Sequence, residues 1–160
     1  MNTNARAIFL DIDGTLIPFG AEAPCEQDRT ALLRARAAGH KVLINTGRSS
    51  GFLPPVLRTA DYLDGFLCGC GTQLIIGGKT LFKQEIPREA LRQVLAYFLE
   101  SPGEGCFFEG ETALLTIQRT HPQGQMLTRA DDFDTRFAGE SVTKLTIWGA
   151  PTQQQRRLLA

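Results

Sequence analysis

The stretch from Ile8 to Leu16 constrains the fold more than any other part of the chain. Its apolar start, Ile-Phe-Leu, is typical of a strand buried on both faces, and Gly14 marks a turn soon after it. Asp11 and Asp13 follow this strand one residue apart, so their side chains share a face. Open α/β sheets place ligands at the carboxyl ends of their strands, and the two acids therefore predict a polar site there.

The spacing of Asp11 and Asp13 also predicts a metal site. Carboxylates held this close repel one another unless a cation or a shared proton compensates their charge. Mg²⁺ prefers oxygen ligands and commonly uses one or two carboxylates together with phosphate oxygens of a substrate. The alternative is an ordinary acidic turn after a strand, but two acids on one face favour the cation site.

The segments that follow predict a parallel crossover. Residues 26–38 show the apolar spacing of a helix, Gly39 is typical of the position after a helix, and residues 41–45 predict a second buried strand. Strand, helix and strand with short connections form a right-handed parallel unit, which brings Asp11 and Thr46 to one edge of the sheet. The Thr46 hydroxyl and the amides after it suit either a helix cap or an anion site, and their place opposite Asp11 favours phosphate.

Two of these stretches resemble motifs of a known superfamily. Motif I of the haloacid dehalogenase superfamily, the aspartate-nucleophile phosphohydrolases, is similar to residues 11–16, DIDGTL. Motif II of its Cof-like, type IIB branch is similar to residues 45–48, NTGR. The resemblance implies an α/β fold, with a Rossmann-like core and its parallel sheet begun by residues 1–83. Residues 84–160 would then form part of an α/β cap domain.

The resemblance also implies a phosphatase that works through an aspartyl-phosphate. Asp11 would be the nucleophile, and Asp13 the general acid and then the general base. Mg²⁺ would be held by the Asp11 carboxylate and the Asp13 backbone carbonyl. Thr46, Gly47 and Arg48 would bind the phosphate. The substrate class implied is a small phosphorylated metabolite, such as a sugar phosphate.

Two motifs of the resembled superfamily find no match in the sequence. The superfamily places a lysine (motif III) and acids in a G-D-x-x-x-D-like loop (motif IV) after the cap, whereas the lysines after Arg48 lie in other contexts, at Lys79, Lys83 and Lys144. The chain therefore resembles the N-terminal part of a Cof-like hydrolase. We expect impaired hydrolysis, since electrostatic stabilisation is usually the largest catalytic term. The open edge of a three-stranded core sheet is an expected surface for self-association.

Composition excludes several classes of partner. Seventeen basic and seventeen acidic residues cancel, which argues against nucleic acid or anionic membranes as partners. No apolar run approaches the roughly 20 residues that span a bilayer, and residues 1–6 lack a signal-peptide core. The four cysteines do not form C-x-x-C pairs, so we interpret them as reduced, small apolar residues of a cytoplasmic protein.

The remaining segments predict a mixture of strands and helices. Residues 120–139 lack a regular pattern, and their paired acids, Asp131 and Asp132, predict a solvated loop. The other expected elements are a helical segment at 54–60, a strand at 65–68, a hairpin of 73–76 and 80–82 across Gly77 and Gly78, a helix from Pro87 with one buried face, a hairpin of 106–109 and 112–117, a strand at 142–148 and a helix from Thr152.

Two other functions remain open. The first is a non-catalytic binding or interaction protein that keeps the first half of the fold without motifs III and IV. The second is a receiver-like phosphoacceptor domain, which also pairs acids beside a hydroxyl. The second is disfavoured because Cys68, and not an aspartate, ends the third strand.

The choice of leaving group would lie with the cap. In the resembled branch the cap closes over the site, so residues between about 85 and 148 would select the substrate. Arg88, Arg92, His121 and Arg129 are candidate contacts there, and we interpret each as an exposed basic side chain.

Overall fold

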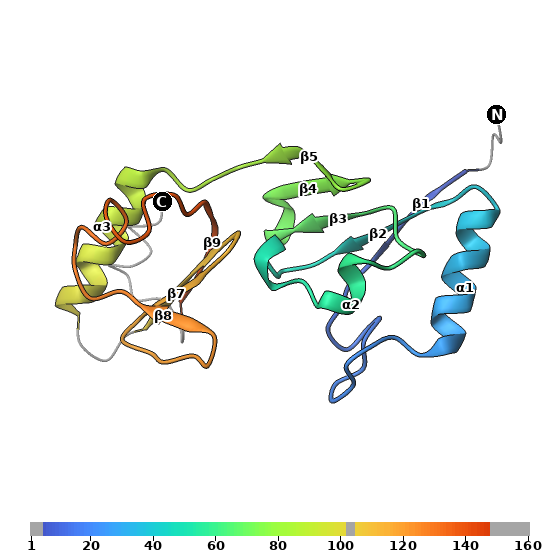
Figure 1. The fold of residues 1–160 in the computed structure, drawn as a ribbon, viewed down its shortest axis with the longest axis horizontal. Coiled ribbons are helices and arrows are strands. Elements are labelled where there is room, and N and C mark those ends of the chain that lie inside the picture. The colour runs from blue at the N-terminus through green and yellow to red at the C-terminus, as the bar shows by residue number, and fades with distance from the viewer. Residues whose placement is uncertain (1–4, 102–104, 148–160) are drawn as a thin grey trace. The chain divides into compact units, whose positions relative to one another are not determined.

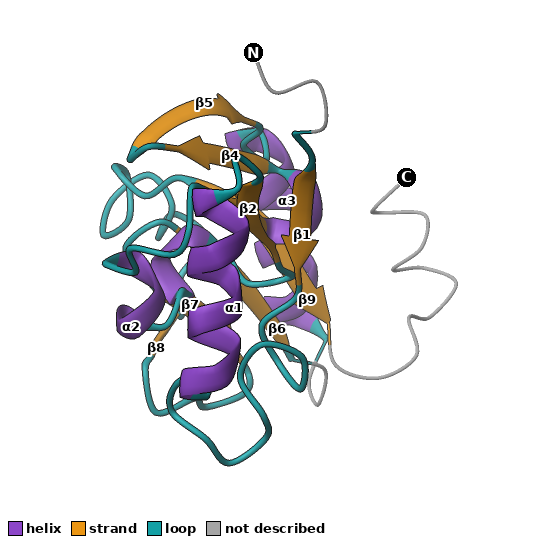
Figure 2. Cartoon of the chain, turned by 90° about the vertical axis from the view of Figure 1, so that its right-hand side faces the viewer, coloured by secondary structure: helices purple, strands orange, loops and turns teal. Residues whose placement is uncertain are grey.

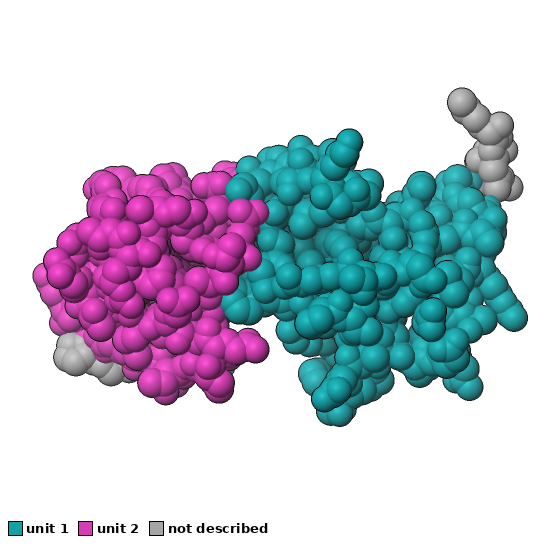
Figure 3. Space-filling view, in the orientation of Figure 1, with its two compact units in different colours: residues 1–83 teal, residues 84–160 magenta. Residues whose placement is uncertain are grey.

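The computed structural model describes residues 5–101 and 105–147 of the 160-residue chain. The chain divides into two compact units, Met1–Lys83 and Gln84–Ala160 (Figure 3). Each unit surrounds its own cluster of buried apolar side chains. Strands and helices occur in both units, and the predicted α/β class is confirmed (Figure 1).

The first unit is built on a five-stranded sheet. In chain order its elements are β1 (Ala7–Leu10), α1 (Glu26–Ala37), β2 (Lys41–Asn45), the 3₁₀ turn η1 (Ser50–Phe52), α2 (Pro55–Arg58), β3 (Gly65–Cys68), the 3₁₀ turn η2 (Gly69–Gly71), β4 (Gln73–Ile76) and β5 (Lys79–Lys83). The strand order is β1-β2-β3-β4-β5, with β1 to β3 parallel and β4 and β5 antiparallel. The hairpin therefore extends the sheet to five strands, so the prediction of a three-stranded core sheet is wrong.

Strand β2 and helix α1 follow their sequence signals closely. Val42, Leu43 and Ile44 are buried, and β2 is an inner strand with a neighbour on each side. Helix α1 packs beside β2 (Figure 2), and the chain leaves it through Gly39, whose φ of +92° favours glycine. The helix contains no fully buried residue and contributes partly buried side chains such as Leu32 to the core.

Strand β1 differs from its prediction as a strand buried on both faces. Among the described residues it pairs only with β2, so it is an outer strand. Ile8 and Leu10 pack against the core, whereas Phe9 points from the opposite face and is 53% exposed. An apolar run in the sequence does not distinguish a central strand from an outer one.

The second unit packs one helix against a four-stranded sheet. Its elements are α3 (Arg88–Glu100), β6 (Cys106–Gly110), β7 (Leu114–Ile117), β8 (Gly124–Met126) and β9 (Val142–Ile147), in the sheet order β8-β7-β6-β9. The buried face predicted for α3 is confirmed at Leu91, Val94, Leu95 and Phe98. Strand β8, three residues long and parallel to β7, was not predicted. Trp148 and the helix predicted from Thr152 lie outside the described residues.

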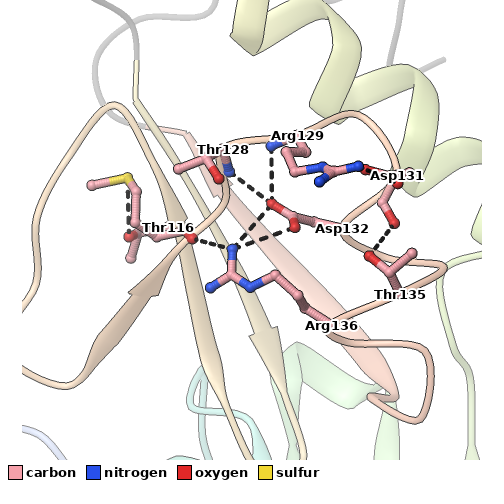
Figure 4. A network of polar contacts seen from close by, with 8 residues as sticks. Thr116, Thr128, Arg129, Asp131, Asp132, Thr135 and Arg136 are labelled. Carbon is pink, nitrogen blue, oxygen red and sulfur yellow. Dashed lines mark hydrogen bonds and ion pairs between the residues drawn. The ribbon is translucent and has the colours of Figure 1, made fainter.

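Two charged residues of the second unit are structural, contrary to their predictions. Arg88, predicted as an exposed base, is partly buried and donates hydrogen bonds to the carbonyl oxygens of Phe133, Phe137, Ala138 and Glu140. Asp132, predicted to be solvated, is fully buried. Its carboxylate accepts the backbone N–H groups of Thr128 (2.7 Å) and Arg129 (3.0 Å) and an N–H of Arg136 (3.3 Å) (Figure 4).

The Asp132→Asn substitution should lower the free energy of unfolding by about 1–3 kcal/mol, because an amide has one acceptor oxygen instead of two and no charge to pair with Arg136. Burial alone would raise the pKa of Asp132, but the two backbone N–H groups and Arg136 lower it. Its stabilisation is therefore complete above the unfolded-state pKa of about 3.9 and is lost as the pH falls through the lower folded-state pKa. Denaturant unfolding from pH 7 to pH 3 should show that the difference in free energy of unfolding between the wild-type chain and the variant becomes smaller at low pH.

The neighbouring carboxylate of Asp131 is the matched control, because it is about half exposed and, among the described residues, pairs with Arg129 alone. Asp131→Asn should change the free energy of unfolding by less than about 1 kcal/mol. Equal losses for the two variants would contradict a structural role for Asp132.

Over the described part of the chain, no helix combines the length and the apolar character needed to cross a lipid bilayer.

Candidate functional site

The carboxyl ends of β1 and β2 are adjacent, as the crossover predicted. The two strands are parallel and Leu10 lies opposite Ile44, so Asp11 and Thr46 leave the sheet at the same edge. The turn after β1 separates its residues by polarity: Ile12, Leu16 and Ile17 are buried, whereas Asp11 and Asp13 are exposed.

Backbone hydrogen bonds hold this turn in place. The N–H of Leu16 donates to the carbonyl of Asp11 (3.2 Å), and the N–H of Ile17 donates to the carbonyl of Ile12 (2.9 Å). Gly14 has a φ of +74°, a conformation that favours glycine, and its N–H donates to the carbonyl of Ile17 (2.9 Å). Because the apolar members of the turn are anchored in the core, both acids are presented at the sheet edge.

Two oxygen-bearing groups at this edge are available to a cation. Within the described residues, neither the Asp11 carboxylate nor the backbone carbonyl of Asp13 takes part in a hydrogen bond or ion pair. Nor do the described residues contain a group of three or more His, Cys, Asp or Glu side chains that could hold a metal. One carboxylate and one carbonyl suit Mg²⁺, which usually keeps several waters and completes its shell with substrate oxygens.

The carboxylate of Asp13 is paired with Arg48. Arg48 Nη2 lies 2.7 Å from Asp13 Oδ1, and Arg48 Nε lies 2.9 Å from Asp13 Oδ2, so the pair is bidentate. Arg48 Nη1 also donates to the carbonyl of Phe52 (3.2 Å), which fixes the guanidinium. The Arg48 guanidinium lowers the pKa of Asp13 and favours its ionised form. This pair joins residues 35 positions apart, and no local sequence signal indicated it.

Thr46 joins β2 to the segments around it. It is buried, its N–H donates to the carbonyl of Leu67 (2.9 Å), and its carbonyl accepts the N–H of Cys70 (3.1 Å). Its Oγ1 accepts the N–H of Arg48 (3.1 Å), a local turn bond of the kind that Thr commonly makes. The described residues offer no acceptor for the Thr46 hydroxyl proton, which leaves this proton available to a ligand.

A cavity of about 600 Å³ opens beside the ion pair. Asp13 and Arg48 contribute to its walls, and Glu22 is the other charged residue that lines it. Its remaining walls are Ile12, Ile17, Pro18, Phe19, Gly20, Ala21, Pro54, Pro55 and Val56.

Three comparisons place these features among known proteins. The sequence profile of the haloacid dehalogenase-like hydrolases matches residues 8–146. YkrA of Bacillus subtilis strain 168, a protein named as a provisional phosphatase, is 25% identical to this chain over 151 residues. The match covers 91% of this chain and 58% of YkrA. The chain thus spans less than two thirds of this relative.

Solved structures show the same fold. The sugar phosphatase BT4131, of HAD subclass IIB, is similar with a TM-score of 0.67 and 23% identity, over 97% of this chain and 62% of that one. The phosphatase BT1666 from Bacteroides thetaiotaomicron is similar with a TM-score of 0.74 and 20% identity, over 95% of this chain and 59% of that one.

Proposed function

The chain belongs to the haloacid dehalogenase-like hydrolases, and from this we propose that it acts in Mg²⁺-dependent hydrolysis of a small phosphate monoester. The proposal rests on the Asp11 carboxylate. It lies exposed at the carboxyl end of β1 without a partner among the described residues, as a carboxylate nucleophile toward phosphorus requires. BT4131 is a sugar phosphatase, which supports a sugar phosphate as the substrate class.

The proposed reaction has two steps on the residues of the turn. An oxygen of Asp11 attacks phosphorus and forms an aspartyl-phosphate, while the Asp13 carboxyl donates its proton to the leaving oxygen. Asp13 then takes a proton from the water that hydrolyses the aspartyl-phosphate. The Asp13 carboxyl can donate only in its protonated form, which Arg48 disfavours while the two are paired. We therefore expect Arg48 to move from Asp13 to the phosphate when substrate binds.

Mg²⁺, when bound, would supply positive charge that offsets the repulsion between Asp11 and a dianionic phosphate. The Asp11 carboxylate and the Asp13 carbonyl are the oxygens that would hold it. Thr46 would donate its hydroxyl proton to a phosphate oxygen, and the N–H of Gly47 and the guanidinium of Arg48 would bind others. All five residues lie on the connections that follow β1 and β2.

Release of inorganic phosphate from p-nitrophenyl phosphate and hexose phosphates, with MgCl₂ or with EDTA, tests the proposal. We expect slow release with Mg²⁺, because the sequence has no match to motifs III and IV, and none with EDTA. The second candidate is a binding protein without turnover, and the Asp13–Arg48 pair favours it, because that pair occupies two of the proposed groups. Binding of phosphate and Mg²⁺ without any turnover would support the binding protein and overturn the phosphatase.

Replacement of Arg48 by Ala should raise KM for a phosphate ester about tenfold or more, since a charged hydrogen bond contributes about 1.5–3 kcal/mol. Initial rates over a range of substrate concentration measure this change. Arg34→Ala, an exposed arginine in the last turn of α1, is the control and should leave KM unchanged. A normal KM in the Arg48 variant would show that Arg48 does not bind the phosphate and only pairs with Asp13.

A further inference from the structure

We propose that the cavity beside Asp13 and Arg48 binds the leaving group of the phosphate ester, and that Phe19 stacks on a ring in that group. The inference rests on the proposed phosphatase function and narrows its substrate to phosphate monoesters whose leaving group contains a ring with a flat apolar face. A sugar ring and an aromatic ring both present such a face. The experiment below distinguishes these two kinds of leaving group.

The size and walls of the cavity suit more than a phosphate group. Its volume of about 600 Å³ lies within the range of about 300–1,000 Å³ that is usual for small-molecule sites. Apolar residues form most of its walls, and the reacting end of the site, Asp13, opens into it. An ester whose phosphorus lies at Asp11 and whose leaving oxygen lies at Asp13 would therefore extend its organic part into this space.

Phe19 is an exposed aromatic side chain on a β-turn whose backbone is ordered by a hydrogen bond. Its residue is 88% exposed. A hydrogen bond from the N–H of Ala21 to the carbonyl of Pro18 (3.0 Å) closes a β-turn around it, and Gly20 has a φ of +85° at the third position, where type II turns need glycine.

The ring of Phe19 lies against Gly14, the residue that follows Asp13 in the turn after β1. A Cβ built on Gly14 would lie only 2.6 Å from Cε2 of Phe19, so the ring occupies the space that this glycine leaves open. A ring that already rests on the Gly14 backbone with one side loses less conformational freedom when a ligand stacks on its exposed side. Phe19 thus offers an aromatic surface beside Asp13, the proposed general acid.

The charges of the cavity favour a neutral, hydroxyl-bearing leaving group. Glu22 is exposed, and its carboxylate has no partner among the described residues. It can accept a hydrogen bond from a hydroxyl of the ligand, and it would repel a second phosphate. These features favour a monophosphate of a sugar or of a hydroxylated aromatic ring.

Binding to the Asp11→Asn chain tests the inference without consuming the ligand. Glucose 6-phosphate and sorbitol 6-phosphate carry the same phosphate, and only the first contains a ring; benzyl phosphate supplies an aromatic one. We expect a ring-bearing ester to bind about tenfold more tightly than sorbitol 6-phosphate and to shift the amide NMR signals of Gly14, Gly20 and Val56. The Phe19→Ala substitution should abolish the preference. Phe82→Ala, an exposed phenylalanine on β5, should preserve it.

The outcomes separate this inference from the proposed function. Tighter binding of glucose 6-phosphate alone assigns a sugar ring, and tighter binding of benzyl phosphate alone assigns an aromatic ring. Equal binding of all three esters, binding of none, or a preference that survives in the Phe19 variant overturns the inference. A wild-type chain that binds ring-bearing esters through Phe19 but releases no phosphate would overturn the phosphatase and leave the ring site standing.

Discussion

The Asp11→Asn variant is expected to release phosphate at least about 10³-fold more slowly than the wild-type chain, because an amide is not a nucleophile toward phosphorus. Initial rates with p-nitrophenyl phosphate and Mg²⁺ measure the loss. Acid-quenched wild-type protein should also carry one phosphoryl group by intact mass, mapped to Asp11 by peptide analysis, and the variant should carry none.

Asp11 offers a clean test because it contributes little to the fold. Its carboxylate is exposed and has no partner among the described residues, so Asp11→Asn should change the free energy of unfolding by no more than about 0.5 kcal/mol. Asp61→Asn, at another exposed carboxylate of the same unit, is the matched control and should keep full activity. Near-normal turnover by the Asp11 variant would exclude an aspartyl-phosphate at this position.

The second large expected effect is the loss of stability when the buried core of either unit is truncated. Phe98→Ala should cost about 3–5 kcal/mol, because the ring is fully buried in the core of the second unit. Leu57→Ala should cost about 2–5 kcal/mol in the core of the first. Since the two clusters share no residue, we expect each variant to raise amide hydrogen exchange in its own unit alone.

Hydrogen exchange followed by NMR, together with denaturant unfolding, distinguishes the possible responses. Gln93→Ala, on the exposed side of α3, is the control and should leave both units protected. A single transition in which Phe98→Ala loosens residues 5–83 as much as residues 84–147 would show that the chain unfolds as one cooperative body and would contradict the proposed division into a core and a cap.

Local signals were sufficient for much of the fold. The glycine pair at 77 and 78 located the β4–β5 hairpin, and the spacing of Leu91, Val94, Leu95 and Phe98 located the buried face of α3. Such signals depend on residues close in sequence. The exposure of Phe9 depends instead on which strands lie beside β1, and strand β8 is too short to show a period.

Buried charges were the features that sequence reasoning missed. Asp132 has the same local sequence context as a solvated acid, yet backbone N–H groups three and four residues before it satisfy its carboxylate. Arg88 likewise finds its acceptors 45 to 52 positions away. At the candidate site, the sequence predicted that the ends of β1 and β2 meet, which the structure confirms, but not that Arg48 would hold Asp13 or that Phe19 would line a cavity.

The bidentate pair between Asp13 and Arg48 has a consequence for phosphate turnover under the proposed mechanism. Asp13 is tethered to the same fold, so it competes for the guanidinium at a high effective concentration that dilution cannot reduce. A ligand must displace this internal anion to reach Arg48, which lowers the apparent affinity of Arg48 for every anion by the same factor. An anion that also binds Mg²⁺ and Thr46, as the proposed phosphate ester would, can offset this cost. When hydrolysis is complete, the return of Asp13 to Arg48 would help to expel the product.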